Sequence, residues 1–253
     1  MFNWKSLDFV YLYDGSFDGL LTMVFECYVQ KAFPSKILPE TNYETNLIEQ
    51  AILISTDTQK AQRIANGILR SISYEAYDNA YHAFLSNETT KELAIVQYLC
   101  NGFMLGPSIS TMLSLPFVFQ VVTLRKKILQ EAHRMFGFVR FVQVGANLFY
   151  SCVHLDHNVI SIIGKHFIHR LPSQQFIIVD QNRNIAFCYD TATFYLANIA
   201  KLTIPPISSE EKEYQNLWKA FFKTIAIPER KNPKLQASYM PRRYWQDLIE
   251  EVN

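Results

Sequence analysis

The chain has 253 residues and a mass of 29.4 kDa; 49% of its residues are hydrophobic and 19% are charged. This composition is typical of a compact globular protein and argues against disorder, and no apolar run approaches the roughly 20 residues of a membrane-spanning helix. The formal net charge is +1, but the charges are segregated: residues 1–119 hold seven basic and twelve acidic residues, whereas residues 120–170 hold seven basic and two acidic ones. We therefore expect an acidic N-terminal part and a basic central surface.

The cysteines and the N-terminus indicate the compartment and the absence of a cofactor. The four cysteines are far apart and form no Cys-x-x-Cys pair, so we expect buried free thiols in a reducing cytoplasm and no iron–sulfur centre. The opening residues, MFNWKSLDF, lack the apolar core of a signal peptide. We expect a cytoplasmic protein that contacts no membrane and carries no cofactor.

The N-terminal part reads as one strand followed by helices. Residues 8–13 predict a strand, and Ser16 caps a helix that runs to about residue 31. The turn between them could cradle an anion, but it lacks the Walker lysine and the full dinucleotide fingerprint, so an ordinary turn and cap is favoured. Residues 47–54 are apolar and ambiguous in type. Further helices are expected at residues 57–71, 74–85 and 89–103.

A central helix from Leu124 to Phe136 is predicted, and Gly137, as the C′ residue just after it, is expected to end it. Its polar side carries basic residues, which form either a solvated face, with Glu131 paired to Lys127 or Arg134, or a functional face. Arg125 lies within the apolar arc and needs a buried partner or a ligand.

Strands and one more helix follow the central helix. Strands are expected at residues 138–144, 148–153, 175–179 and 185–189, and a helix capped by Asp156 at residues 157–170. The predicted fold class is α+β: a helical N-terminal part packed with an antiparallel helix-β-β-helix-β-β sheet that helices cover on one side. We expect a single compact domain, 1–253, because no flexible linker is evident. Its parts are a mostly helical, acidic region (1–119), a basic α+β core (120–200) and a C-terminal helix with a basic, aromatic arm (201–253).

The C-terminal arm, residues 228–245, alternates basic and aromatic residues after the last long helix. Cations beside aromatic rings are the composition that follows phosphates and stacks on bases. The same residues could instead lie across the body of the protein, with the rings buried and the charges in water. Both interpretations stay open.

Six segments stand out along the chain: YLYDGSFDGLL (11–21), EAHRMFGFVRF (131–141), Asp156-His157 through His166-Phe167 to Arg170, FIIVD (176–180), RKNPKLQ (230–236) and MPRRYW (240–245). In this order they resemble a bacterial family of DNA-metabolism and DNA-repair proteins. Proteins of this kind are encoded beside a radical-SAM DNA-modification or repair protein, or fused to a uracil-DNA-glycosylase-like domain. The resemblance therefore implies a role in DNA metabolism and such a partner, without supplying a mechanism.

The histidines do not predict a metal site. His154 and His157 are three residues apart, as are His166 and His169, but neither pair is expected to converge, and no His-Glu-x-x-His arrangement is present. No nucleophile signature surrounds a serine or cysteine. The candidates for acid–base chemistry are His133, His157, His166 and Asp180, and Asp180 with His133 would form a pair only if the fold brought them together.

Three functions compete. The preferred one is a DNA-associated accessory protein that binds nucleic acid, a partner enzyme, or both; the alternatives are a nucleic-acid-processing enzyme with a His/Asp site and a protein-interaction scaffold. Whether the chain is an enzyme stays open. The residues expected to contact nucleic acid are Lys126, Lys127, Arg134, Arg140, Arg230, Lys231, Lys234, Arg242, Arg243, Tyr244 and Trp245.

Overall fold

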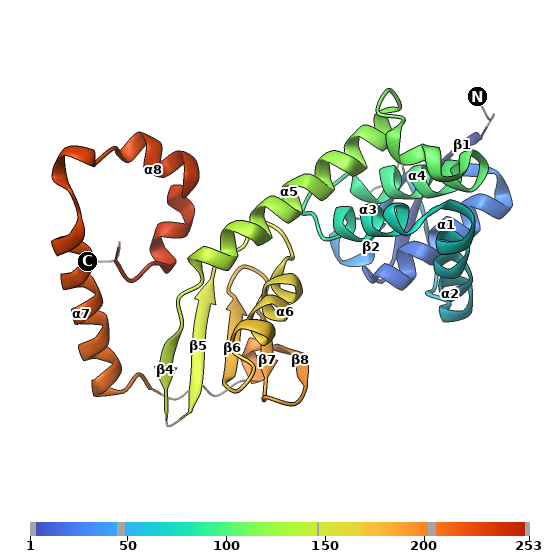
Figure 1. Ribbon diagram of the computed structural model, residues 1–253. Coiled ribbons are helices and arrows are strands. Elements are labelled where there is room, and N and C mark those ends of the chain that lie inside the picture. Colours follow the sequence, from blue (N-terminus) through green and yellow to red (C-terminus); the bar gives the residue numbers. More distant parts are fainter. Residues whose placement is uncertain (1–3, 45–48, 146, 202–205, 251–253) are drawn as a thin grey trace. The chain divides into compact units, whose positions relative to one another are not determined.

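The computed structural model describes residues 4–44, 49–145, 147–201 and 206–250 (Figure 1). Internal packing divides the chain into two compact units, Met1–Leu129 (unit 1) and Gln130–Asn253 (unit 2). The boundary falls inside one helix, α5 (Pro116–Phe138), and not near a loop. Whether the chain unfolds as the single domain expected from the sequence therefore stays a prediction. Limited proteolysis tests it, because two stable fragments would contradict it.

Unit 1 contains a three-stranded parallel sheet. Strand β1 (Lys5–Tyr13) lies between β2 (Ala32–Pro39) and β3 (Gln50–Leu53). The sequence predicted β1, left the region of β3 ambiguous (Leu47 and Ile48 lie outside the described residues) and missed β2. Strand β2 holds two prolines, which an edge strand tolerates but which weaken the local signal.

Helices surround this sheet and confirm the predicted pattern. Helix α1 (Phe17–Gln30) starts where Ser16 accepts a hydrogen bond from the Gly19 N–H. It is followed by α2 (Thr58–Gly67) with its π-helical extension η2 (Ile68–Ile72), α3 (Tyr74–Phe84), α4 (Lys91–Leu105) and the short η3 (Gly106–Thr111). Their buried faces form one apolar core. With the second sheet described below, helices and strands are both present throughout the chain, and the predicted α+β class is confirmed for the chain.

Helix α5 starts at Pro116 and runs to Phe138, so Gly137 lies inside the helix and does not end it. The strand expected from residue 138 is correspondingly shorter. Arg125 has the partner that its position required: its Nε lies 2.7 Å from Asp78 Oδ2. Among the described residues no single helix is long and apolar enough to cross a membrane. Lys91–Thr111 and Pro116–Phe138, bent by 59°, reach that length and composition only as a pair.

Unit 2 is built on a five-stranded sheet in the order β4-β5-β6-β7-β8. Its strands are β4 (Val142–Val144), β5 (Leu148–Val153), β6 (Gln175–Asp180), β7 (Ile185–Tyr189) and β8 (Phe194–Asn198). The expectation of an antiparallel sheet was wrong for one pairing, because β5 and β6 run parallel. Helix α6 (Ile160–Arg170) connects them as a crossover, which returns the chain to the starting end of the sheet. Strand β8 was not predicted.

Helix α6 covers one face of this sheet (Figure 1). Gly164 permits the close approach, since a Cβ there would lie 2.4 Å from Phe187 Cγ. The helix begins at Ile160, and Asp156 does not cap it as expected; the Asp156 side chain pairs with Arg243 instead.

The C-terminal part of unit 2 is a long helix followed by short turns. Helix α7 (Ser209–Ile225) is capped by Ser208, and η5 (Pro228–Arg230), α8 (Pro233–Tyr239) and η6 (Arg242–Asp247) follow. Tyr244 and Leu248 are fully buried, so this end of the chain is part of the unit's core. All four cysteines are free; three are buried, as expected, and Cys152 is half-buried.

Candidate functional site

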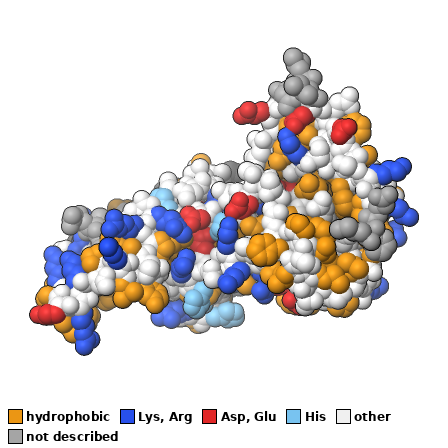
Figure 2. Space-filling model, turned by 90° about the horizontal axis from the view of Figure 1, so that it is seen from above, with side chains coloured by type: hydrophobic (Ala, Val, Ile, Leu, Met, Phe, Trp, Pro, Cys, Tyr) orange, Lys and Arg blue, Asp and Glu red, His pale blue; other side chains and the backbone are white. Residues whose placement is uncertain are grey.

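The C-terminal segment carries a group of exposed basic side chains. Arg230, Lys231, Lys234 and Arg242 are exposed and form no ion pair among the described residues. The guanidinium of Arg242 lies 5.7 Å from the ring of Trp245, whose indole N–H donates to the Met240 carbonyl. Figure 2 shows Lys and Arg side chains gathered on one face of this unit, with hydrophobic side chains between them. The segment therefore combines free cations with aromatic rings, as the sequence indicated.

Three residues expected to contact nucleic acid are engaged within the protein. Arg140 donates to the Gly137 carbonyl at 2.7 Å and to Glu250 at 2.8 Å. Arg243 pairs with Asp156 at 2.7 Å and lies over the Tyr244 ring. Tyr244 is fully buried, so its ring cannot stack on a base in this conformation. Tyr239, 73% exposed, is instead the accessible ring of the segment.

The remaining predicted contacts lie on α5 and belong to different units. Lys126 and Lys127 are in unit 1, where both are exposed and Lys127 pairs with Glu88 at 3.1 Å. Arg134 is in unit 2, half-buried, without an ion pair among the described residues. A shared surface of these three residues and the C-terminal segment stays a prediction.

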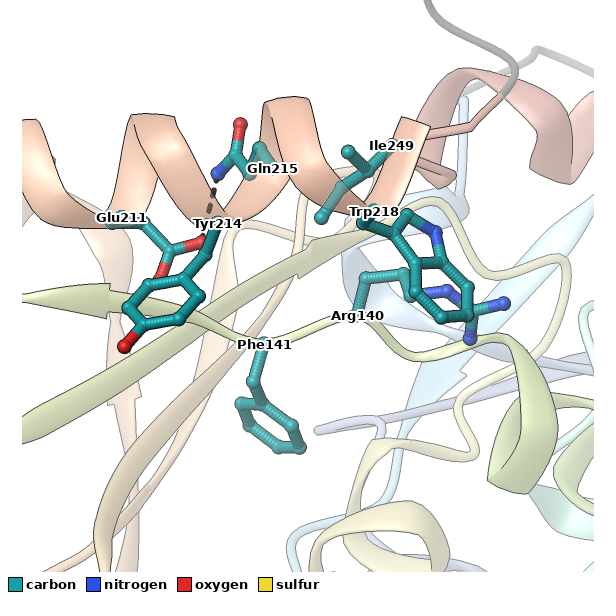
Figure 3. A pocket seen from close by; sticks show the side chains of 7 residues that line it. All are labelled: Arg140, Phe141, Glu211, Tyr214, Gln215, Trp218 and Ile249. Carbon is teal, nitrogen blue, oxygen red and sulfur yellow. Dashed lines mark hydrogen bonds between the residues drawn. The ribbon is translucent and has the colours of Figure 1, made fainter. Parts of the chain in front are cut away.

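An open pocket of about 490 Å³ lies between α7 and the chain before β4 (Figure 3). It is lined by Arg140, Phe141, Glu211, Tyr214, Gln215, Trp218 and Ile249. Trp218 donates its indole N–H to Glu250, so the two residues that engage Glu250 both line this pocket. Along α7 the large apolar side chains follow a helical stripe and remain 38–69% exposed: Tyr214, Leu217, Trp218, Phe221, Phe222 and Ile225.

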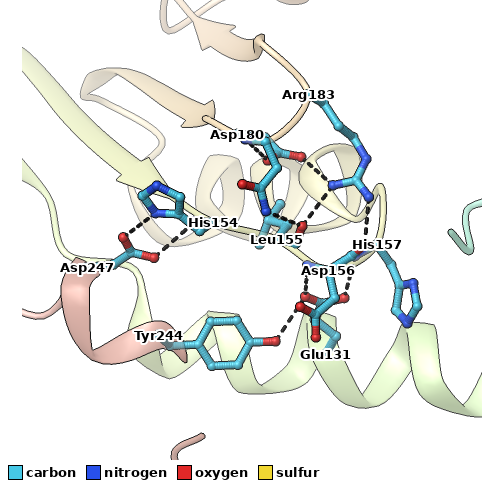
Figure 4. Close-up of polar contacts among 10 residues, drawn as sticks. Glu131, His154, Leu155, Asp156, His157, Asp180, Arg183, Tyr244 and Asp247 are labelled. Carbon is cyan, nitrogen blue, oxygen red and sulfur yellow. Dashed lines mark hydrogen bonds and ion pairs between the residues drawn. The ribbon is translucent and has the colours of Figure 1, made fainter. Parts of the chain in front are cut away.

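A network of buried carboxylates holds the loop between β5 and α6 (Figure 4). Glu131, 4% exposed, accepts hydrogen bonds from the backbone N–H groups of Asp156 (2.7 Å) and His157 (3.0 Å) and from the Tyr244 hydroxyl (3.0 Å). The expected pairing of Glu131 with Lys127 or Arg134 was therefore wrong. Its side chain binds a loop far along the chain, which helical spacing does not reveal.

The same loop is held from the other side by Asp180. Asp180 is fully buried and accepts from Arg183 at 2.9 Å and from the Asn182 N–H at 3.1 Å. Arg183 donates onward to the carbonyls of Leu155 and Asp156, and Asn182 to that of Leu155. Asp180 is thus an anchor of the loop, and no hydrogen bond joins it to His133 among the described residues.

His154 and Asp247 form a pair that the sequence did not indicate. The Nδ1 of His154 lies 2.7 Å from Asp247 Oδ1, and its backbone N–H donates to Oδ2 at 3.0 Å. An aspartate at Nδ1 orients the ring and leaves Nε2 as the proton acceptor, the arrangement of a general base. Ninety-three residues separate the two, so no local pattern could have found them. Cys152, two residues before His154, is not activated, because burial raises the pKa of its thiol.

The histidines named as catalytic candidates do not gather at one point. His133 is exposed and lies edge-on to Phe136, whereas the His166 ring stacks on Phe136 with centroids 4.0 Å apart. Burial, with Arg170 and His169 nearby, lowers the pKa of His166. His157 is half-buried on the loop. Among the described residues no three His, Cys, Asp or Glu side chains are placed to hold a metal ion, and elemental analysis remains the test of that prediction.

Comparisons with known proteins identify a family without an assigned activity. No functionally curated protein matches the sequence. A solved structure, the pGpG-specific phosphodiesterase PggH from Vibrio cholerae, resembles 86% of this chain and 98% of its own with 12% identity and a TM-score of 0.35, a likeness too weak to support an inference. Residues 89–250 match DUF4130, a domain of unknown function, and the chain belongs to that family.

Proposed function

We propose that this chain is an accessory protein of DNA metabolism that binds nucleic acid through residues 228–245. The observation that carries the proposal is the contrast between the basic and acidic side chains of unit 2. Arg230, Lys231, Lys234 and Arg242 are exposed without an ion pair among the described residues. Within residues 228–245 the single acidic residue is Glu229, and four acidic side chains elsewhere in the unit, Glu131, Asp180, Asp247 and Glu250, are buried and engaged within the protein.

The accessible aromatic ring favours a single-stranded substrate. Tyr239 lies between Lys234 and Arg242 in the chain and is 73% exposed, which suits stacking on an unpaired base. Four phosphate contacts on a single strand would give a slope of roughly −3 for log affinity against log salt. A duplex cannot use the ring in this way, so it should bind more weakly than a single strand of equal length.

Fluorescence anisotropy with labelled single-stranded and duplex DNA and RNA, at several salt concentrations, tests this interface. Replacing Arg230, Lys231 and Lys234 together with Ala should weaken binding equally across sequences and flatten the salt slope by roughly one for each phosphate that is no longer neutralised. Tyr239→Ala should weaken binding to single strands by about 1–3 kcal/mol and leave duplex binding nearly unchanged.

The matched control removes the same charge from unit 1. Lys5, Arg63 and Arg70 are exposed there, and their joint replacement with Ala should leave the affinity within about twofold of wild type. The interface would be rejected if wild type bound no nucleic acid at low salt. Equal weakening in the two triple variants would show only a non-specific effect of net charge.

We further propose that the apolar stripe of α7 binds the partner enzyme. Single exposed apolar side chains are common on protein surfaces, but here six lie on one face of a helix. Such a stripe is typical of a helix that docks against a partner protein. The resemblance of the sequence to DNA-metabolism proteins supports a radical-SAM or uracil-DNA-glycosylase-like partner. Pull-down with Leu217→Glu and Phe221→Glu should lose that partner, whereas Asn216→Glu, on the opposite side of α7, should retain it. Recovery of neither enzyme by wild type would contradict the partnership.

A second candidate, a nucleic-acid-processing enzyme, is favoured by the His154–Asp247 pair. In that case His154→Ala and Asp247→Asn would each abolish turnover of a nucleic-acid substrate by the isolated chain, while binding persisted. His133→Ala and His166→Ala would then serve as comparison variants, because neither ring has a carboxylate partner among the described residues. Absence of turnover by wild type would leave the accessory function as the better account.

A further inference from the structure

Unit 1 contains a second pocket, of about 430 Å³, that no part of the proposed nucleic-acid interface uses. It lies where the start of the sheet meets α4, η3 and the start of α5. The wall is mostly aromatic and aliphatic, formed by Trp4, Phe33, Leu105, Met112, Leu115 and Phe117. Trp4 and Phe33 are stacked, with ring centroids 4.7 Å apart and planes 28° apart. A pocket of this size and lining matches the sites that small, largely apolar ligands occupy.

The polar groups of this pocket are few, uncharged and available. Gln97 and Asn101 are one helical turn apart on α4, and both line the pocket. Asn101 donates to the Gln97 carbonyl at 2.8 Å, which leaves its own amide oxygen and the whole Gln97 side-chain amide without a partner among the described residues. Both side chains are half-buried, so their free amide groups are accessible to water or to a ligand in the pocket.

The lining indicates the chemistry of the ligand. Among the residues that the structure describes, no Lys, Arg, Asp or Glu lines the pocket, so this lining offers nothing to neutralise a phosphate, a carboxylate or an ammonium group. Aromatic and aliphatic walls favour a flat ring. Carboxamide side chains present a donor and an acceptor together, which is how Asn and Gln recognise the hydrogen-bonding edge of a base.

We propose that this pocket binds a neutral, planar heteroaromatic ring of the nucleobase class, with the ring against the aromatic wall and its polar edge on Gln97 and Asn101. The ring could come from a free nucleoside or from an unstacked base of a strand, since the pocket contacts would be the same. The proposal stands apart from the interface of unit 2, because all the lining residues belong to unit 1.

Calorimetry and ligand-observed NMR with the full chain test the proposal, using adenosine, guanosine, cytidine and uridine at millimolar concentration. Indene serves as a flat apolar probe without hydrogen-bonding groups. Gln97→Leu should weaken nucleoside binding about five- to tenfold and leave indene binding unchanged, because it removes the amide and keeps the volume. Leu105→Trp, at a partly exposed position of the wall, should block both ligands by filling the pocket. Gln62→Leu, at an exposed site on α2, is the matched control and should change neither.

Each outcome decides the proposal. Failure of wild type to bind any nucleoside, or an unchanged affinity in Gln97→Leu, overturns it; binding of indene alone would assign the pocket to an apolar group such as a partner's side chain. A short single-stranded oligonucleotide separates the two sources of the ring. If the base belongs to a strand, the Arg230/Lys231/Lys234 variant should lose the strand but keep the nucleoside. Failure of the interface in unit 2 would thus leave nucleoside binding by unit 1 intact.

Discussion

Unit 1 is held together by apolar side chains such as Leu20, Met23 and Leu99, whereas unit 2 combines an apolar core with several buried carboxylates. In unit 1 one acidic side chain, Glu92, is buried among the described residues, and one of its oxygens has no partner there. In unit 2, Glu131 and Asp180 hold the loop after β5, and Asp247 and Glu250 tie the C-terminal segment to His154 and Arg140. A buried carboxylate with several hydrogen-bond partners holds a loop in one conformation, because each partner must be correctly placed. An apolar core accepts any side chains that are hydrophobic and fill the available volume.

The largest expected effect comes from removing the carboxylate at the centre of the network in unit 2. Glu131→Ala should lower the free energy of unfolding of that unit by about 3–5 kcal/mol, because two backbone N–H groups and the Tyr244 hydroxyl would be left without their charged acceptor. Chemical denaturation in a Trp4→Phe background reports unit 2 through Trp218 and Trp245. Glu213→Ala, at an exposed site on α7, is the control. A decrease below about 1 kcal/mol for Glu131→Ala would mean that the network does not stabilise the unit.

In unit 1 the stability should be most sensitive to the loss of a buried apolar side chain. Leu99→Ala should lower the free energy of unfolding of this unit by about 3 kcal/mol, through reduced apolar burial and the cavity left behind. A Trp218→Phe, Trp245→Phe background leaves Trp4 as the fluorescent reporter. Leu113→Ala, at a 51% exposed site, is the control and should lower the free energy of unfolding only slightly. If Leu99→Ala lowered the stability of both units equally, the chain would unfold as one cooperative domain.

A smaller effect is expected where α6 meets the sheet of unit 2. Gly164→Ala would place a methyl group 2.4 Å from the Phe187 ring and should cost about 1–3 kcal/mol through overpacking. Gly137→Ala is the matched control, since a Cβ there meets nothing within 4 Å and the residue lies inside α5. That change should stabilise the helix by about 0.5–1 kcal/mol. Equal effects of the two substitutions would contradict the close packing of α6 on Phe187.

The smallest effect is a difference between the units in their response to acid. Burial raises the pKa of Glu92 above 4.5, so the folded unit 1 binds this proton more readily than the unfolded chain. The contribution of Glu92 to the free energy of unfolding of unit 1 should therefore become more favourable as the pH falls from the raised pKa towards 4.5. For Glu250, burial alone would raise the pKa, but hydrogen bonds from Arg140 and Trp218 outweigh burial and lower the pKa. Glu250 therefore stabilises folded unit 2 above pH 4.5, and this stabilisation is lost as the pH falls through the lowered pKa.

Unfolding between pH 3 and pH 7 with Glu92→Gln and Glu250→Gln measures these two contributions separately. Glu92→Gln should remove the gain on acidification in unit 1, and Glu250→Gln should remove the decrease in unit 2. The same slope in wild type and in both variants would show that neither carboxyl group is linked to folding.

The sequence by itself determined the features that depend on neighbouring residues. Strands β5 and β7 begin and end at the predicted residues, 148–153 and 185–189, Ser16 caps α1, and Arg125 has the partner that its place in an apolar arc required. These features follow from backbone periodicity and from the cost of burying an unpaired charge, both of which can be evaluated within a short stretch. The basic and aromatic composition of residues 228–245 was evident in the same way.

Only the tertiary structure decided which distant groups meet. The parallel pairing of β5 with β6, the pair of His154 with Asp247, and the bond from Tyr244 to Glu131 join residues 27 to 113 positions apart. Each buried polar group must find a partner somewhere in the fold, and several positions along the chain could have supplied one. Residue type therefore indicated that Glu131 and Tyr244 needed partners, while the packing of the whole of unit 2 selected them.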